Sequence, residues 1–205
     1  MKLGRRTLLL GAAATLVATR ASADDLDALL ADVAKARRTV RTMKASFTQE
    51  RAMKLLATSI KSTGQLAYVA PDRLRWELAA PDDIVYWVGP EGLSYRTKSS
   101  QATVPTGGAN VARALADLRA LLGGDLAALR DRYVLSGSRG PDSATVEGTA
   151  KDPKATSVRA FTLVLDKSLL LPVKARLTEG KADTIDIVFA NAAVNVPVDP
   201  ATMKP

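Results

Sequence analysis

Alternation of apolar and polar residues over long stretches constrains the fold of this chain more than any other feature. Between residues 73 and 78, Leu74, Trp76 and Leu78 point to one side, and the charged residues between them point to the other. Similar alternation recurs through much of 45–96 and 133–196. Short turns rich in Pro, Asp and Gly separate these segments. The pattern therefore predicts an antiparallel sheet built mainly from hairpins.

The alternation can be divided into individual strands. The expected strands are Phe47–Arg51, Ser59–Val69, Arg73–Leu78, Ile84–Val88, Leu93–Thr97, Tyr133–Ser136, Ser143–Glu147, Val158–Leu165, Leu170–Leu177, Thr184–Phe189 and Ala193–Val196. The polar stretch from Ser99 to Gly108 ends in two glycines, which is typical of a loop.

Helical periodicity interrupts the strands in two places. Over residues 24–45, apolar residues recur at spacings near three, four and seven, which predicts a helix with one buried side. After residue 110 the same period returns, with Leu115, Leu118 and Leu122 on one face and a Gly-Gly stop behind them. A second short helix is expected over 125–132.

These elements predict an α+β fold, in which one many-stranded antiparallel sheet carries helices inserted in the chain. Because strands twist, such a sheet curls, and a helix near each end of the first meander can lie across its mouth. The alternative is a flatter sheet with helices packed tightly on one face and no cavity between them.

The first 23 residues predict a secretory signal peptide. A basic start precedes an apolar run of about twelve residues, too short to cross a bilayer, and Ala21-Ser22-Ala23 forms a small-residue cleavage pattern. Arg5-Arg6 leaves both the twin-arginine and the Sec export routes open. We expect residues 24–205 to form a single soluble domain. An N-terminal membrane anchor is the alternative.

Composition excludes several classes of function. The chain has no Cys and no His, so disulfides, Ser-His-Asp triads and zinc sites built on thiolate or imidazole are excluded. The formal charge of +8 falls to about +4 without the signal peptide, and no basic stripe suggests a nucleic-acid partner. Asp82-Asp83 lacks calcium-loop spacing, and no group of residues forms a convincing acid–base pair. We therefore expect no catalytic site, no metal and no cofactor.

Aromatic residues are scarce and concentrated in one region. Five of the nine lie between residues 68 and 95: Tyr68, Trp76, Tyr86, Trp87 and Tyr95. They fit either the ordinary core of a sheet or the wall of an apolar pocket for a hydrophobic ligand. The sequence pattern leaves both interpretations open.

Several segments, taken in order, resemble the LolA family of periplasmic outer-membrane lipoprotein carriers. They are Ala45-Ser46-Phe47-Thr48-Gln49, Gly64-Gln65-Leu66, the segment from Ala70 to Leu78, and Pro81 onward into Val85–Gly92. The agreement in order and spacing covers roughly residues 26–97. Beyond it, only the pattern of helices followed by strands is shared.

The resemblance implies an incomplete β-barrel with a lid of helices and an interior that shelters acyl chains. The residues expected to contact the ligand are Leu66, Tyr68, Leu74, Trp76, Leu78, Trp87, Leu115, Leu118 and Leu122. It also implies a periplasmic monomer that takes acylated lipoproteins from an inner-membrane release complex to an outer-membrane receptor. A LolA-like binding or sensory module for another lipid or hydrophobic molecule is the alternative, and an enzyme is a more remote one.

One departure from the family affects the expected lid. Well-studied members carry an Arg just before the Pro of the second strand, where it latches the lid, and this chain has Ala70 there. We therefore expect the lid to close through apolar contacts between the strand residues and the helix leucines, without an Arg latch.

The signal peptide gives a direct prediction. Protein recovered from the periplasm should begin at Asp24, as read by N-terminal sequencing, because cleavage follows Ala23. Replacing Arg5 and Arg6 by Lys should abolish export on the twin-arginine route and leave Sec export intact. Recovery of the full-length chain from membranes would contradict cleavage.

Overall fold

One antiparallel sheet of eleven strands organises the part of the chain that the structure describes. The computed structural model describes residues 23–54, 57–105, 110–180 and 182–205, with the side chains of 23, 105, 110–115 and 118 excepted. The strands are β1 Thr42–Met53, β2 Thr58–Val69, β3 Arg73–Leu78, β4 Ile84–Gly89, β5 Gly92–Arg96, β6 Gln101–Pro105, β7 Tyr133–Arg139, β8 Ser143–Ala150, β9 Val158–Asp166, β10 Pro172–Glu179 and β11 Asp183–Val194.

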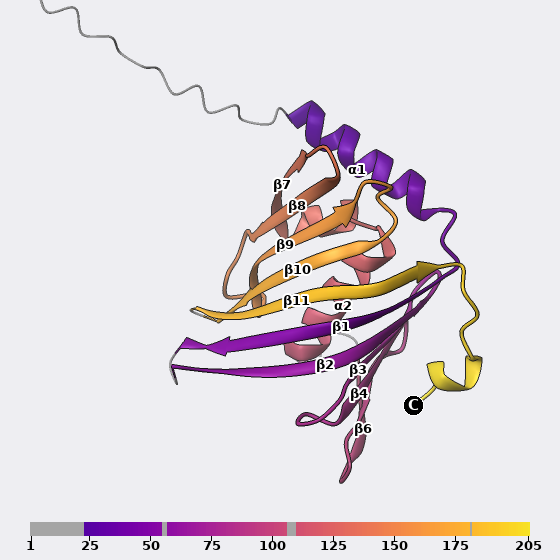
Figure 1. Ribbon diagram of the computed structural model, residues 1–205. Helices are drawn as coiled ribbons and strands as arrows, with labels where there is room; N and C mark the ends of the chain where they lie inside the picture. Colours follow the sequence, from indigo (N-terminus) through magenta and orange to yellow (C-terminus); the bar gives the residue numbers. More distant parts are fainter. Residues whose placement is uncertain (1–22, 55–56, 106–109, 181) are drawn as a thin grey trace, which may run out of the picture.

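Four helical segments accompany the sheet within these residues. They are the α-helices α1 (Ala23–Arg37) and α2 (Asn110–Gly123) and the 3-10 helices η2 (Ala127–Asp131) and η3 (Pro200–Met203). α1 packs beside β7, and α2 with η2 lies beneath the arch of the sheet (Figure 1).

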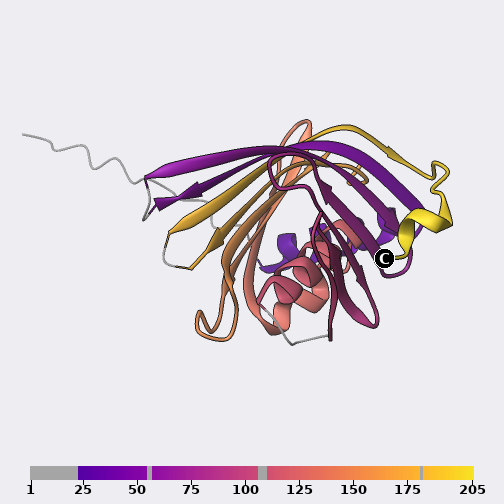
Figure 2. The same ribbon diagram turned by 90° about the horizontal axis from the view of Figure 1, so that it is seen from below.

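The order of the strands is β6-β5-β4-β3-β2-β1-β11-β10-β9-β8-β7. Each half of the sheet is a meander of neighbouring hairpins, and the pairing of β1 with β11 joins the two halves. The edge strands β6 and β7 do not pair with each other, so the sheet arches over α2 without closing (Figure 2). This confirms the expected α+β architecture with a curved, incomplete barrel.

The strand register separates two faces of the sheet. Trp76 lies opposite Leu66 and Tyr86, and Phe47 lies opposite Phe189, so these side chains share the inner, concave face. Neighbouring residues along each strand point to the outer face. The apolar half of the alternation therefore lines the inside of the arch, where α2 and η2 cover it.

The first helix ends earlier than its periodicity predicted. α1 stops at Arg37, and Val40 and Met43 belong to the turn and to β1. Both residues are buried, so their apolar spacing fitted a helix as well as it fits the beginning of a strand. The sequence alone could not separate the two because a short apolar spacing satisfies both periods.

Two further expectations on the strands were wrong. Gln101–Pro105 forms the edge strand β6, although its polar character indicated a loop, because an edge strand has one neighbour and needs little apolar surface. The two short strands expected over 184–196 are a single strand, β11, whose pairing with β1 is irregular between Lys44 and Ser46.

The inner face is tightly packed where β1, β2 and β3 meet. The rings of Phe47 and Trp76 stack with centroids 3.9 Å apart. A β-carbon on Gly64 would lie 2.2 Å from the Phe47 ring and 2.2 Å from the Glu77 backbone oxygen. Glycine is therefore required here by the close approach of a ring and a neighbouring strand.

We predict that Gly64→Ala destabilises the protein by about 2 kcal/mol or more, because the neighbouring backbone leaves no room for a methyl group. Denaturant unfolding measures the effect. Gly140→Ala is the control, since its β-carbon would meet only ordinary contacts at 3.5 Å. Equal stability of the two variants would contradict the packing described here.

Candidate functional site

Five of the expected ligand-contacting residues come together on the inner face of the sheet. Each is less than a tenth exposed, and all belong to one apolar cluster: Leu66, Tyr68, Leu74, Trp76 and Leu78. They come from β2 and β3, whose register places Leu66 opposite Trp76 and Tyr68 opposite Leu74. The Tyr68 hydroxyl donates to the Pro71 carbonyl at 2.7 Å, so its polar end is satisfied within this wall.

Trp87 does not belong to this wall. Trp87 lies opposite Arg75, whereas its neighbour Val88 lies opposite the inner-face residue Leu74. Trp87 therefore points to the outer face. There its indole nitrogen donates to the Thr202 carbonyl at 2.8 Å, and Arg96 stacks over its ring. The expectation that Trp87 contacts an interior ligand is thus wrong, because adjacent residues of a strand face opposite sides of a sheet.

Helix α2 covers the inner face. Leu121 and Leu122 are fully buried in the same cluster as Trp76, and Leu126 and Leu129 continue the contact beyond the helix. Leu122 is therefore placed as expected. The side chains of Leu115 and Leu118 lie outside the described part of the structure. At Leu121 and Leu122 the interior is filled by leucine side chains.

A buried arginine holds the C-terminal end of α2. Arg37, only 5% exposed, donates from Nη1 to the Leu122 carbonyl at 2.5 Å and from Nε to the Leu169 carbonyl at 3.2 Å. Burial lowers the pKa of Arg37 to about 10, with Asp166 acting in the opposite direction. Its aliphatic stem packs against Gly124, where a β-carbon would collide with it at 2.4 Å. The sequence pattern predicted only apolar contacts for this helix, and the structure adds a polar contact from a buried arginine of α1.

A second polar anchor holds the middle of the same helix. Asp117, 2% exposed, accepts from the Tyr133 hydroxyl at 2.7 Å and forms an ion pair with Arg132. Burial raises the pKa of the Asp117 carboxyl, while the hydrogen bond from Tyr133 and the charge of Arg132 oppose the shift. On the outer side of α2, Arg119 donates to the Asp72 carbonyl at 3.1 Å. Helix α2 is thus held by a few polar contacts as well as by its leucines.

The inner face continues past α2 at one end of the arch. The β1–β2 and β10–β11 hairpins extend beyond the helix in both views (Figures 1 and 2). There the inner-face residues Ile60 and Ile185 are only half-buried. Arg51 lies opposite both in the strand register. We call this end, lined by Arg51, Ile60, Glu179 and Ile185, the hairpin mouth.

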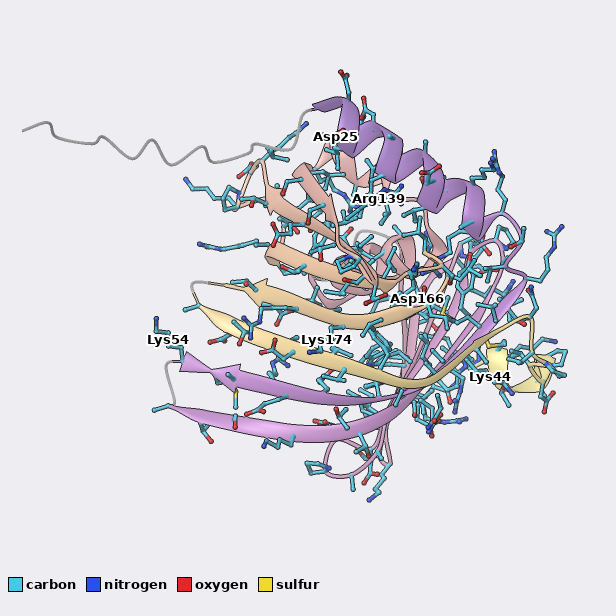
Figure 3. All side chains as sticks on the ribbon, turned by 45° about the horizontal axis from the view of Figure 1, so that its top comes forward. Asp25, Lys44, Lys54, Arg139, Asp166 and Lys174 are labelled. Carbon is cyan, nitrogen blue, oxygen red and sulfur yellow. The ribbon has the colours of Figure 1, made fainter. Side chains whose placement is uncertain are left out.

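The outer face carries shallow hollows. Three of them, of about 430, 530 and 360 Å³, all include the exposed Val188 of β11 in their lining. Their other lining residues are mostly Thr, Ser and charged residues from the outer sides of the strands. Figure 3 shows this face, with Lys44 and Lys174 labelled on it.

Two kinds of feature are absent from the residues that the structure describes. No group of three or more His, Cys, Asp or Glu side chains within them could hold a metal ion. No helix among them is long and apolar enough to cross a membrane.

Comparison with known proteins identifies the family. The model of the family described as "Outer membrane lipoprotein carrier protein LolA" matches residues 38–205, which is most of the chain. The chain belongs to the LolA family. A comparison with curated proteins found no match.

Solved structures share the arrangement of strands and helices. An uncharacterized conserved protein from Thermus thermophilus superposes with a TM-score of 0.52 at 10% identity, over 88% of this chain and 93% of that one. A DUF1329 family protein from Desulfovibrio piger gives 0.51 at 11%, over 87% and 96%. A LolA superfamily protein from Nitrosomonas europaea gives 0.46 at 11%, over 87% and 97%. At such identities the first two show a common fold.

In this LolA-family chain, sequence reasoning missed residues on both sides of the interior. Phe47 and Phe189 complete the aromatic group around Trp76, and Phe161 and Leu163 belong to the same cluster in the opposite half of the arch. Alternation along their strands could have placed several of them on the inner face. The roles of Arg37 and Asp117 had no such signal, because each binds residues distant in the sequence.

The contacts of Arg37 with α2 give a testable prediction. Arg37→Lys should destabilise the protein by about 2 kcal/mol, because a lysine cannot donate to two carbonyls in the fork geometry of a guanidinium. Amide hydrogen exchange should increase selectively at the C-terminal end of α2. Arg38→Lys is the control, since Arg38 is exposed. Unchanged exchange in Arg37→Lys would show that Arg37 does not hold the helix.

Proposed function

We propose that this protein is a periplasmic carrier that shelters the acyl chains of lipoproteins and moves them from the inner to the outer membrane. The observation that carries the proposal is the apolar inner face of an unclosed sheet, covered by a helix and not by further strands. A helical cover can move away without breaking the ladder of the sheet. Membership of the LolA family supports the same function.

The leucines of α2 would act as a substitute for the ligand. Leu121 and Leu122 belong to the same buried cluster as Trp76, so an acyl chain enters by taking their place in it. Each buried leucine contributes about 1.5–3 kcal/mol, and a chain contributes about 0.8 kcal/mol for each buried CH₂. A long chain therefore offers more apolar contact than the leucines it displaces.

The polar anchors define how the cover opens. Arg37 and Asp117 hold the end and the middle of α2, so loss of these contacts releases the helix as a unit. The hairpin mouth, where the inner face is half-buried, is the route by which a chain reaches the interior. We propose that Leu115 and Leu118 complete the apolar face of the cover.

The remaining parts of the proposal concern location and partners. The signal peptide of residues 1–23 directs export, and residues 24–205 act as one soluble carrier domain. The carrier works as a monomer, receives its cargo from an inner-membrane release complex and delivers it to an outer-membrane receptor. No cofactor, metal, catalytic residue or nucleic acid takes part.

The two tryptophans allow a test with an internal control. In the Trp87→Phe variant, tryptophan fluorescence comes only from Trp76 on the inner face. In the Trp76→Phe variant, it comes only from Trp87 on the outer face. A diacylated lipopeptide should shift the emission of the first variant and leave the second unchanged. Equal responses, or none, would contradict binding at the inner face.

The identity of the cargo needs a second measurement. Mass spectrometry of protein purified from the periplasm should find acylated lipoprotein bound, and the protein should release lipoproteins from spheroplasts. Copurification of free lipid or another hydrophobic molecule alone would instead favour a binding or sensory module.

A further inference from the structure

The charged pair at the hairpin mouth lies at the edge of the apolar interior, and its position points to a role in ligand selection. Arg51 of β1 donates from Nη2 to Glu179 of β10 at 2.8 Å. The pair crosses β11 on the inner face, because Arg51 lies opposite Ile185 and Glu179 opposite Asp183. It therefore lies over the half-buried Ile185, where a chain would enter.

The two members of the pair differ in their exposure to solvent. The Arg51 side chain is 47% exposed, and that of Glu179 is 19% exposed. By strand alternation, Arg51 is the one cation on the inner face among the described strand residues of these two hairpins. Asp183 beside the pair accepts from the backbone N–H of Lys54 at 3.1 Å, at the hairpin tip labelled in Figure 3.

Arg51 also acts on the interior. Burial raises the pKa of the Tyr86 phenol, and among the nearby charges Arg51 acts against that shift. Tyr86 lies opposite Trp76 on the inner face, and strand alternation places Arg51 on that same face, at its far end. The side chain is thus placed to meet the polar end of a molecule whose apolar chain lies inside.

An unpaired arginine in this position would favour an anionic head group. A guanidinium above an apolar surface binds a carboxylate or phosphate well. Glu179 removes this preference, because an anion that approaches Arg51 must either displace the Glu179 carboxylate or lie beside it. The uncharged carbonyl of an ester or amide needs only a free N–H of the guanidinium, which carries five donors.

We infer that Glu179, by pairing with Arg51, selects ligands whose acyl chains end in uncharged ester or amide groups and excludes free fatty acids. This inference rests on the proposed function and specifies its ligand class. Glu179 is a specificity-determining residue, since it acts by occupying Arg51. The same rule favours chains attached to a protein through neutral linkages over anionic lipids of equal length.

Calorimetric titration with lauroylglycerol and with laurate tests this inference. The two share one chain and differ in the charge of the head, and low salt preserves the effect of that charge. The wild-type protein should bind lauroylglycerol more tightly. Glu179→Gln should tighten laurate binding roughly fivefold and change lauroylglycerol binding less than about twofold. Arg51→Gln should bind laurate more weakly than the wild-type protein does.

Glu147→Gln is the matched control, because Glu147 is exposed on the outer side of β8 and should leave both affinities unchanged. An unchanged ratio of the two affinities in Glu179→Gln, or a wild-type preference for laurate, would overturn the selection by Glu179 while leaving the carrier function standing. Failure of both ligands to bind any variant would overturn both.

Discussion

The arch exists because β1 pairs with β11. Each half of the sheet forms from neighbouring hairpins, but only this pairing, between strands more than a hundred residues apart, makes one curved sheet of them. It brings Phe189 to Phe47 and Trp76, with ring centroids 6.3 and 6.2 Å apart. The two halves of the interior therefore share one aromatic centre, and the concave face exists only once the pairing has formed.

The cover over that face combines two kinds of contact with different consequences. Leucine burial is non-directional, so another apolar chain can replace it. The contacts of Arg37 and Asp117 are directional and place α2 in one position. Burying both groups carries a desolvation cost, which is consistent with the lowered pKa of Arg37 and the raised pKa of Asp117. The polar contacts therefore fix the position of α2, while another apolar chain could replace the packing of its leucines.

The division between the two faces also explains where specificity can arise. Deep in the arch the wall is apolar and distinguishes ligands mainly by size and area. On the inner face of the two long hairpins, charge is available at the hairpin mouth, where water still reaches the side chains. Arg51 and Glu179 lie at this boundary, so a preference for one class of head group belongs there and not among the leucines.

Local pattern was sufficient to predict the period-two strands, the position of α2, and the inner-face wall of Leu66, Trp76 and their neighbours, because alternation is a local property that burial on one face enforces. The chain also carries, in order, the motifs that resemble the LolA family. Three features emerged only from the folded arrangement: Trp87 faces outward, residues 101–105 form an edge strand, and Arg37 binds the C-terminal end of α2. Each of these depends on which distant segment lies beside a residue, and hydrophobic periodicity holds no information about that.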